Sequence, residues 1–221
     1  MAFRKTHGDN PEKLLFLDID GVLNSFAFYK LSKQYKRDKI NNPWYARQYD
    51  LNKLQLLKEI HDRTKCTIVM SSSWRGFYFD PKSKSRCGDG CNRLKRDLKR
   101  LKIIIRYRTS NNYDKEEYAR QNHCEWVKNE DGTYNSKFID DGKTPPLITK
   151  FYERGYQINE FLQRWKRHYP KTKFAILDDD IGDLFLFGDN FVNTKWYGDT
   201  EEECGLTPEI VERIIKILNG E

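Results

Sequence analysis

Residues 13–24 of the chain read KLLFLDIDGVLN. Residues 14–17 form a short unbroken apolar run, which is typical of a parallel strand buried on both faces. The run ends in Asp18 and Asp20, and Gly21 permits a sharp turn directly after them. Because ligands of open α/β sheets bind beyond the carboxyl ends of the strands, we expect both acids to face a crevice. One acid can bind metal and attack as a nucleophile while the other moves a proton; a strand followed by a plain Asp-Gly turn is the alternative.

The size and composition of the chain indicate a globular protein. Its 221 residues suit one domain, or a core domain that carries an insertion. The 38% hydrophobic and 14% aromatic content is sufficient for a buried core without disulfide bonds.

Neither a secretory signal peptide nor a membrane span is predicted. Residues 1–12 are polar at most positions, and no apolar run approaches the ~20 residues that a spanning helix needs. The five cysteines are odd in number and irregularly spaced, which favours a reducing compartment. We therefore expect a cytoplasmic protein without a membrane partner.

The net charge of +7 is concentrated in one segment. Residues 76–108 contain eleven Lys or Arg and three acids, a local charge of +8. Such a patch attracts anions and is a usual feature of proteins with phosphate-rich partners, although a solvated helix face would have the same composition.

A second apolar run, residues 66–70, also ends in polar groups. Ser71 and Ser72 follow it directly, and their hydroxyls can donate hydrogen bonds to a phosphate oxygen or simply cap a turn. Residues 25–49 are aromatic and basic, which indicates a loop or a small helical flap over the site. The leucine spacing from Leu51 onward predicts a crossover helix between the two strands.

A third apolar run, residues 174–177, ends in the acids Asp178, Asp179 and Asp180, with Asp183 shortly after them. Three acids at one strand end repel each other unless a cation partners them. Calcium-binding loops instead spread their ligands over about a dozen residues, so this arrangement does not match one. The flanking segments 156–168 and 207–218 have the apolar periodicity of helices packed on a sheet.

Residues 76–149 do not continue the alternation of apolar strands and helices, and we therefore predict that they form an insertion. It contains a helical pattern at 93–101, a strand pattern at 103–105, a second helical pattern at 115–128 and an Asp131-Gly132 hairpin signal. Two cysteines and an adjacent His-Cys pair raise the question of a zinc site, but their spacing is unusual, so ordinary thiols are preferred (Cys87, Cys91, His123 and Cys124).

Taken together, the motifs at the three strand ends resemble those of the haloacid dehalogenase-like (HAD) phosphohydrolases. The resemblance covers most of the predicted core, namely residues 13–24, 66–75 and 150–218. It is greatest to the HAD branch found in multidomain nucleic-acid-repair proteins. The fold that it implies is a Rossmann-like, doubly wound parallel α/β sheet formed by residues 1–75 and 150–221, with residues 76–149 as a basic inserted cap.

The resemblance also implies roles for the acids. Asp18 would be the nucleophile that accepts the phosphoryl group. Asp20 would protonate the leaving oxygen and later activate water, and its backbone carbonyl would contact the metal. Asp179 would bind Mg²⁺, with Asp178 and Asp183 directly on the metal or just behind it.

The phosphate-binding groups are implied in the same way. Ser72 would contact the phosphoryl oxygens, and Ser71 would do so if the alignment slips by one residue. A cationic side chain would neutralise nucleophile and phosphate; Arg154 fits its position, with Lys150 as the substitute.

The function that we expect is a Mg²⁺-dependent phosphatase acting on a nucleotide or on a phosphorylated nucleic-acid end, of the 3′-phosphatase type. Basic residues of the insertion are the candidate nucleic-acid contacts (Arg93, Lys95, Arg96, Lys99 and Arg100). The alternative is a non-catalytic nucleic-acid-binding module on a HAD scaffold, since a fold alone does not prove a function.

Overall fold

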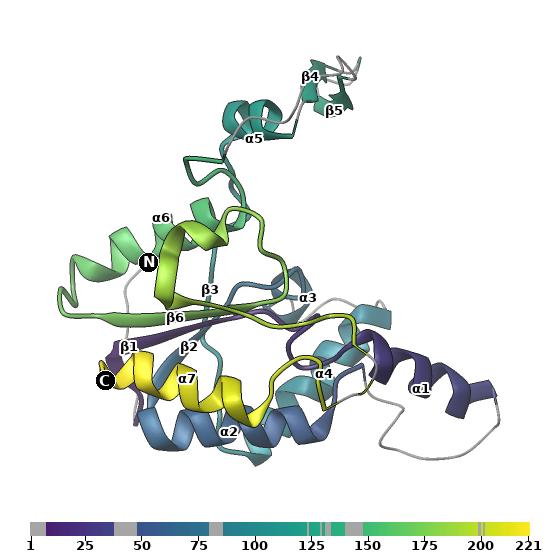
Figure 1. The fold of residues 1–221 in the computed structure, drawn as a ribbon, viewed down its shortest axis with the longest axis vertical. Coiled ribbons are helices and arrows are strands. Elements are labelled where there is room, and N and C mark those ends of the chain that lie inside the picture. Colours follow the sequence, from purple (N-terminus) through teal and green to yellow (C-terminus); the bar gives the residue numbers. More distant parts are fainter. Residues whose placement is uncertain are drawn as a thin grey trace.

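A parallel sheet with helices on both faces forms the centre of the protein (Figure 1). Its structure, a computed structural model, describes residues 8–37, 48–79, 86–122, 124–128, 130, 134–139, 148–198, 200 and 202–221. The strand order is β3-β2-β1-β6-β7, and every neighbouring pair is parallel. The strands are β1 (Asn10–Leu17), β2 (Cys66–Met70), β3 (Tyr107–Arg108), β6 (Lys173–Asp178) and β7 (Phe191–Asn193). The doubly wound α/β fold predicted from the apolar runs is confirmed, with β1 in the middle.

The side chains of β1 alternate between two hydrophobic cores. Leu15 and Leu17 pack in the core beneath the helices α2 (Leu51–Thr64), α4 (Arg86–Arg100) and α7 (Pro208–Asn219). Leu14 and Phe16 pack on the opposite face against α6 (Arg154–Lys166) and the 3₁₀ helix η1 (Leu184–Asn190). Burial on both faces explains why this strand is an unbroken apolar run.

The closing helix α7 begins and ends as its sequence predicts. The Thr207 hydroxyl accepts a hydrogen bond from the backbone N–H of Ile210 at 3.3 Å, and Pro208 occupies the first turn. Gly220 ends the helix with a φ of 78°, a left-handed conformation that favours glycine.

Part of the predicted insertion belongs to the central sheet. Leu94 and Leu98 of α4 are fully buried in the same core as Leu15, and β3 pairs with β2 through Val69 and Tyr107. The sheet therefore extends through residue 108, and the cap predicted over residues 76–149 includes this part of it.

Two elements of this segment differ from the sequence patterns. Residues 103–105 alternate buried, exposed and buried as an extended chain does, but strand pairing begins only at Tyr107. The helical pattern at 115–128 is divided into α5 (Lys115–Gln121) and strand β4 (Cys124–Lys128), which pairs antiparallel with β5 (Tyr134–Phe138). These elements project away from the sheet (Figure 1), and the predicted hairpin turn at residues 131–132 lies outside the described residues.

One helix follows each of the first two strand ends. Helix α1 (Phe26–Arg37) occupies the predicted flap region, and the rest of that region, residues 38–47, lies outside the described residues. Helix α3 (Arg75–Phe79) begins directly beyond the serines that follow β2. Within the described ranges, no helix combines the length and the apolar character needed to cross a membrane.

Candidate active site

Three carboxylates meet at the carboxyl ends of the two central strands. Asp18 follows β1, Asp178 ends β6 and Asp179 comes next; one oxygen from each lies within 4.8 Å of the others. The backbone pairing places them there, because the N–H of Asp18 donates to the carbonyl of Leu177 at 3.0 Å and so continues the β1–β6 ladder. The structure thus brings together acids that are 160 positions apart in the sequence.

Arg154, at the start of α6, supplies a positive charge to this acidic group. Its Nη1 atom lies 3.2 Å from Asp18 Oδ1 and 3.1 Å from Asp178 Oδ2, and it also donates to the Ser71 backbone carbonyl. Burial alone would lower the pKa of Arg154, but the Asp178 and Asp18 carboxylates raise it above the usual value. The guanidinium therefore stays charged and lies between the carboxylates of Asp18 and Asp178.

The negative charge of the acidic group exceeds what Arg154 alone offsets. Burial raises the pKa of Asp18, against the opposing effects of Arg154 and of a hydrogen bond from the Ser72 hydroxyl. Burial and the nearby Asp18 carboxylate raise the pKa of Asp178 well above its usual range and that of Asp179 to about 6. Both shifts mean that the ionised carboxylates favour a further cation between them.

The acidic group fits a magnesium ion. All of its donors are carboxylate oxygens, the hard ligands that Mg²⁺ prefers. The buried Oδ2 atom of Asp178 accepts no hydrogen bond from the described residues, although it faces Arg154. Gly21, at a φ of 70°, lets Asp179 approach, because a Cβ at that position would lie 2.1 Å from the Asp179 Cγ atom.

Asp20 lies beside this group but has different partners. Its carboxylate accepts hydrogen bonds from Trp74 Nε1 at 3.0 Å and from Asn24 Nδ2 at 2.9 Å. The Asn24 side chain in turn accepts from the N–H of Gly21 at 2.9 Å. These contacts hold the Asp20 carboxyl group in one orientation without placing it in the three-acid group.

Trp74 and Asn24 are functional candidates that the sequence analysis did not single out. Trp74 lies two positions after Ser72, and Asn24 is the last residue of the quoted stretch 13–24. An indole N–H and a side-chain amide are hydrogen-bond donors. Their position next to predicted acids and serines is the feature of the sequence that could have indicated a contact with Asp20.

The two serines after β2 lie against the acidic group. Ser72 is fully buried, hydrogen-bonds to Asp18 and accepts from the N–H of Trp74 at 3.3 Å. The buried Ser71 hydroxyl has no hydrogen-bond partner among the described residues, while its backbone N–H donates to Leu17 at 2.9 Å. Both remain candidates for contact with a phosphoryl oxygen.

Asp183 lies outside the three-acid group of the described residues, so its expected place directly on the metal or just behind it stays a prediction. Its two carboxylate oxygens accept from the backbone N–H groups of Tyr152, Glu153 and Gly155 at 2.8, 2.9 and 2.7 Å. A Cβ at position 155 would lie 2.8 Å from the Asp183 Cγ atom, so glycine is required for this approach. These hydrogen bonds from the backbone to Asp183 therefore fix the position of the first turn of α6, which contains Arg154.

Replacing Asp183 by Ala is expected to affect stability and turnover together. Loss of three hydrogen bonds to backbone N–H groups, two of them buried, should lower the free energy of unfolding by about 1–3 kcal/mol. A displaced Arg154 should lower kcat by up to about 10²-fold. Denaturant unfolding and phosphate release measure the two effects, with the exposed Asp189→Ala as control. Unchanged kcat in folded Asp183→Ala protein would show that this contact does not position Arg154.

The remaining predictions concern Lys150 as a phosphate-binding residue and a possible zinc site. Lys150 is exposed, and its charge contributes, after hydrogen bonds from Arg120 and Gln121, to lowering the pKa of Glu117 to about 2. For the zinc alternative, Cys91 is buried and Cys124 lies in β4, whereas the Cys87 side chain and His123 lie outside the described residues.

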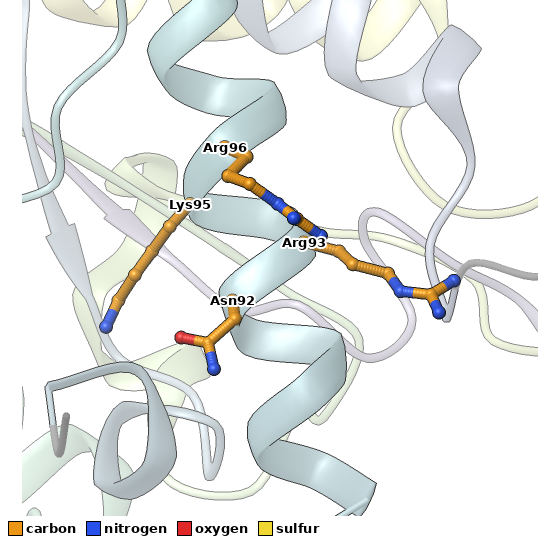
Figure 2. A pocket seen from close by; sticks show the side chains of 4 residues that line it. All are labelled: Asn92, Arg93, Lys95 and Arg96. Atoms are coloured by element: carbon orange, nitrogen blue, oxygen red, sulfur yellow. The ribbon is translucent and has the colours of Figure 1, made fainter. Parts of the chain in front are cut away.

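The predicted basic contacts lie on α4. Of the five, all are exposed except Lys95, whose ammonium lies 4.8 Å from the ring centre of Tyr78 (Arg93, Lys95, Arg96, Lys99 and Arg100). A pocket of about 560 Å³ is lined by Asn92, Arg93, Lys95 and Arg96. Figure 2 shows Asn92 and Lys95 on one side of the helix and the two arginines on the other.

Helix α4 lies close to the partners of Asp20. A Cβ on Gly90 would meet Gln48 Oε1 at 2.3 Å and the Trp74 Cη2 atom at 3.6 Å. The same Trp74 donates to Asp20, and the Gln48 carbonyl accepts from Asn24 at 2.9 Å. The residues that line the basic pocket begin two positions after Gly90 on the same helix.

A family model described as "HAD domain in Swiss Army Knife RNA repair proteins" matches residues 14–211. The chain belongs to this family. Membership confirms the resemblance to HAD repair-protein phosphatases, and the matched range includes residues 76–149, which the motifs alone did not cover. Neither the curated proteins nor the solved structures compared with this HAD domain gave a match.

Proposed function

We propose that this HAD domain is a Mg²⁺-dependent phosphatase that hydrolyses a phosphomonoester, with a phosphorylated nucleic-acid end, of the 3′-phosphate type, as substrate. The observation that carries the proposal is that Asp18 lies next to Arg154 and two more acids. Asp20, two residues after Asp18 in the sequence, is held nearby by hydrogen bonds. A phosphate ester and a carboxylate nucleophile are both anionic, so the reaction needs cations that bring them together.

The residues that would hold the metal are Asp18, Asp178 and Asp179. Bound there, Mg²⁺ would shield negative charge and polarise the phosphoryl oxygens. Arg154 would share this role from its position between Asp18 and Asp178, and the serine hydroxyls beyond β2 would orient the phosphoryl group.

In the first half-reaction, a carboxylate oxygen of Asp18 attacks phosphorus, and the bond from phosphorus to the ester oxygen breaks. Asp20 donates its proton to the leaving oxygen, so an alcohol leaves and an aspartyl-phosphate forms. In the second, Asp20 takes a proton from a water molecule whose oxygen attacks phosphorus. Inorganic phosphate is released, and both acids return to their starting states.

The nucleic-acid part of the proposal rests on α4 and on the family. The family description refers to RNA repair proteins. Three basic residues of α4 line a pocket, and Gly90 of the same helix lies beside Trp74, which donates to Asp20, so a strand leaving the site can contact this helix. A mononucleotide offers only one phosphate group to such a surface.

Inorganic phosphate release from a panel of phosphomonoesters tests the proposal. The panel contains nucleoside monophosphates, a sugar phosphate, and oligonucleotides with a 3′- or a 5′-phosphate. We expect the highest kcat/KM on the 3′-phosphorylated oligonucleotide. Equal values for mononucleotides would contradict the nucleic-acid substrate, and oligonucleotide binding without turnover of any compound would favour the non-catalytic module.

Removing charge from α4 should weaken oligonucleotide use selectively. With Lys95, Arg96, Lys99 and Arg100 all changed to Gln, each lost phosphate contact should reduce the log-log salt slope of binding by about 0.7. We would measure hydrolysis of a 3′-phosphorylated oligonucleotide and of a nucleoside monophosphate across a salt series.

A matched control removes the same charge at the end of α6 remote from Arg154. It changes four exposed residues to Gln, namely Arg164, Lys166, Arg167 and Lys171. Equal losses in both quadruple variants, or equal losses on both substrates, would reject α4 as a strand-binding surface.

A further inference from the structure

Arg75 is a buried cation at the start of α3. Its side chain is mostly enclosed, with 9% of the residue surface exposed. The guanidinium donates to Asn111 Oδ1 at 2.7 Å, to the Ser72 carbonyl at 2.9 Å and to Gln157 Oε1 at 3.0 Å. All three acceptors are neutral, so no carboxylate among the described residues forms an ion pair with Arg75.

A guanidinium in this position has capacity for an anion. It carries five N–H donors, of which the recorded contacts use three. A buried guanidinium without an ion-pair partner is costly: burial and the positive Arg154 lower the pKa of Arg75 to about 10, although the Asp18 carboxylate opposes them. An anionic ligand would supply the missing counter-charge.

The surroundings of Arg75 contain a second cation and unpaired hydroxyls. Arg108 Nη1 donates to the Arg75 carbonyl at 3.3 Å, and its exposed guanidinium lies 5.3 Å from the Phe79 ring centre. Thr109 follows β3 next to the end of β2, where its N–H donates to the Met70 carbonyl at 3.1 Å. Its buried hydroxyl, like that of Ser71, has no hydrogen-bond partner among the described residues.

Arg75 and Arg154 lie next to each other but are engaged differently. Arg75 contacts Gln157, which lies three residues after Arg154 and so on the same side of α6. Arg154 forms ion pairs with Asp18 and Asp178. The hydrogen bonds of Arg75 instead hold the Arg75 side chain on the β3 side of Ser72. The site therefore offers two neighbouring positions for anions, one at the nucleophile and one beside it.

We infer that Arg75, with Arg108 beside it, binds a second phosphate of the substrate, the phosphodiester adjacent to the terminal phosphomonoester. This inference rests on the proposed phosphatase function and names its substrate class: a strand end with at least two consecutive phosphates. Arg75 thereby selects polynucleotide ends over mononucleotides, a selection that a contact to the terminal phosphate cannot make.

Dinucleotides with a terminal 3′-phosphate test this inference. One carries the natural, charged phosphodiester, and the other carries a neutral methylphosphonate at the same linkage. The unmodified protein is expected to prefer the charged linkage by at least about tenfold in kcat/KM, as for a charge-assisted hydrogen bond. In Arg75→Gln the preference is expected to shrink to about twofold or less.

Three variants serve as comparisons. Arg75→Lys, which keeps the charge, should retain part of the preference. Arg108→Gln changes an exposed side chain and should reduce the preference even if Arg75→Gln does not fold. Arg106→Gln, at an exposed position just before β3, removes one charge nearby and should leave the preference unchanged. Equal losses by Arg75→Gln on both dinucleotides would assign Arg75 to the terminal phosphate and overturn the inference.

Binding in the Asp18→Asn background separates this inference from the proposed function. Fluorescence anisotropy with the same two dinucleotides measures the charge preference without turnover. A preference that disappears with Arg75→Gln supports the second phosphate site even if no hydrolysis occurs. Equal binding of both linkages before any change at Arg75 would overturn the inference while leaving phosphatase activity intact.

Discussion

Asp18→Asn is expected to abolish turnover, lowering kcat by at least about 10³-fold, because loss of a nucleophile costs several orders of magnitude. An amide of nearly the same shape cannot form the covalent intermediate. Folding should survive, since burial raises the pKa of Asp18 and thus disfavours its charged form. Arg154 also keeps its contact with Asp178 at 3.1 Å in this variant.

Phosphate release and thermal unfolding together check this expectation. Asp180→Asn is the matched control, because Asp180 is an exposed acid beside the three-acid group but outside it. Trapping of a phosphorylated protein with substrate should succeed for the control and fail for Asp18→Asn. If folded Asp18→Asn protein retained more than about a tenth of the activity, the covalent mechanism would be wrong.

The strand ends could be predicted because their chemistry is local. Each core strand is an apolar run that stops at a polar group, as at Asp18, Ser71 and Asp178. Parallel strands place their carboxyl ends at one edge, so the meeting of these groups follows from the pattern.

The parts that could not be predicted depend on contacts between distant segments. Asp183 has the same residue type and neighbourhood as Asp179, yet it accepts from backbone N–H groups about thirty positions earlier. Trp74 reaches Asp20 across 54 positions. Strand β3 has only two residues, which is too short for any periodicity to indicate it.

Removing divalent cations is the second change expected to have a very large effect. Excess chelator should reduce activity to background, and Mg²⁺ should restore it, because one guanidinium does not offset three carboxylates and a phosphate ester. Ca²⁺ should occupy the same oxygens but inhibit, since its looser, higher-coordinate geometry spoils in-line alignment. Full activity in chelator would refute the metal assignment.

Asp179→Asn tests the same site through binding rather than catalysis. A ligand that binds only the folded state at 100 times its dissociation constant stabilises it by about 2.7 kcal/mol. Mg²⁺ should therefore raise the Tm of the unmodified protein and of Asp180→Asn. The rise should be much smaller for Asp179→Asn, because an amide oxygen is a weaker ligand at the point where the three acids meet. An equal rise in all three proteins would place the bound Mg²⁺ away from Asp179, so the acids at the end of β6 would then serve to hold Arg154 rather than a metal.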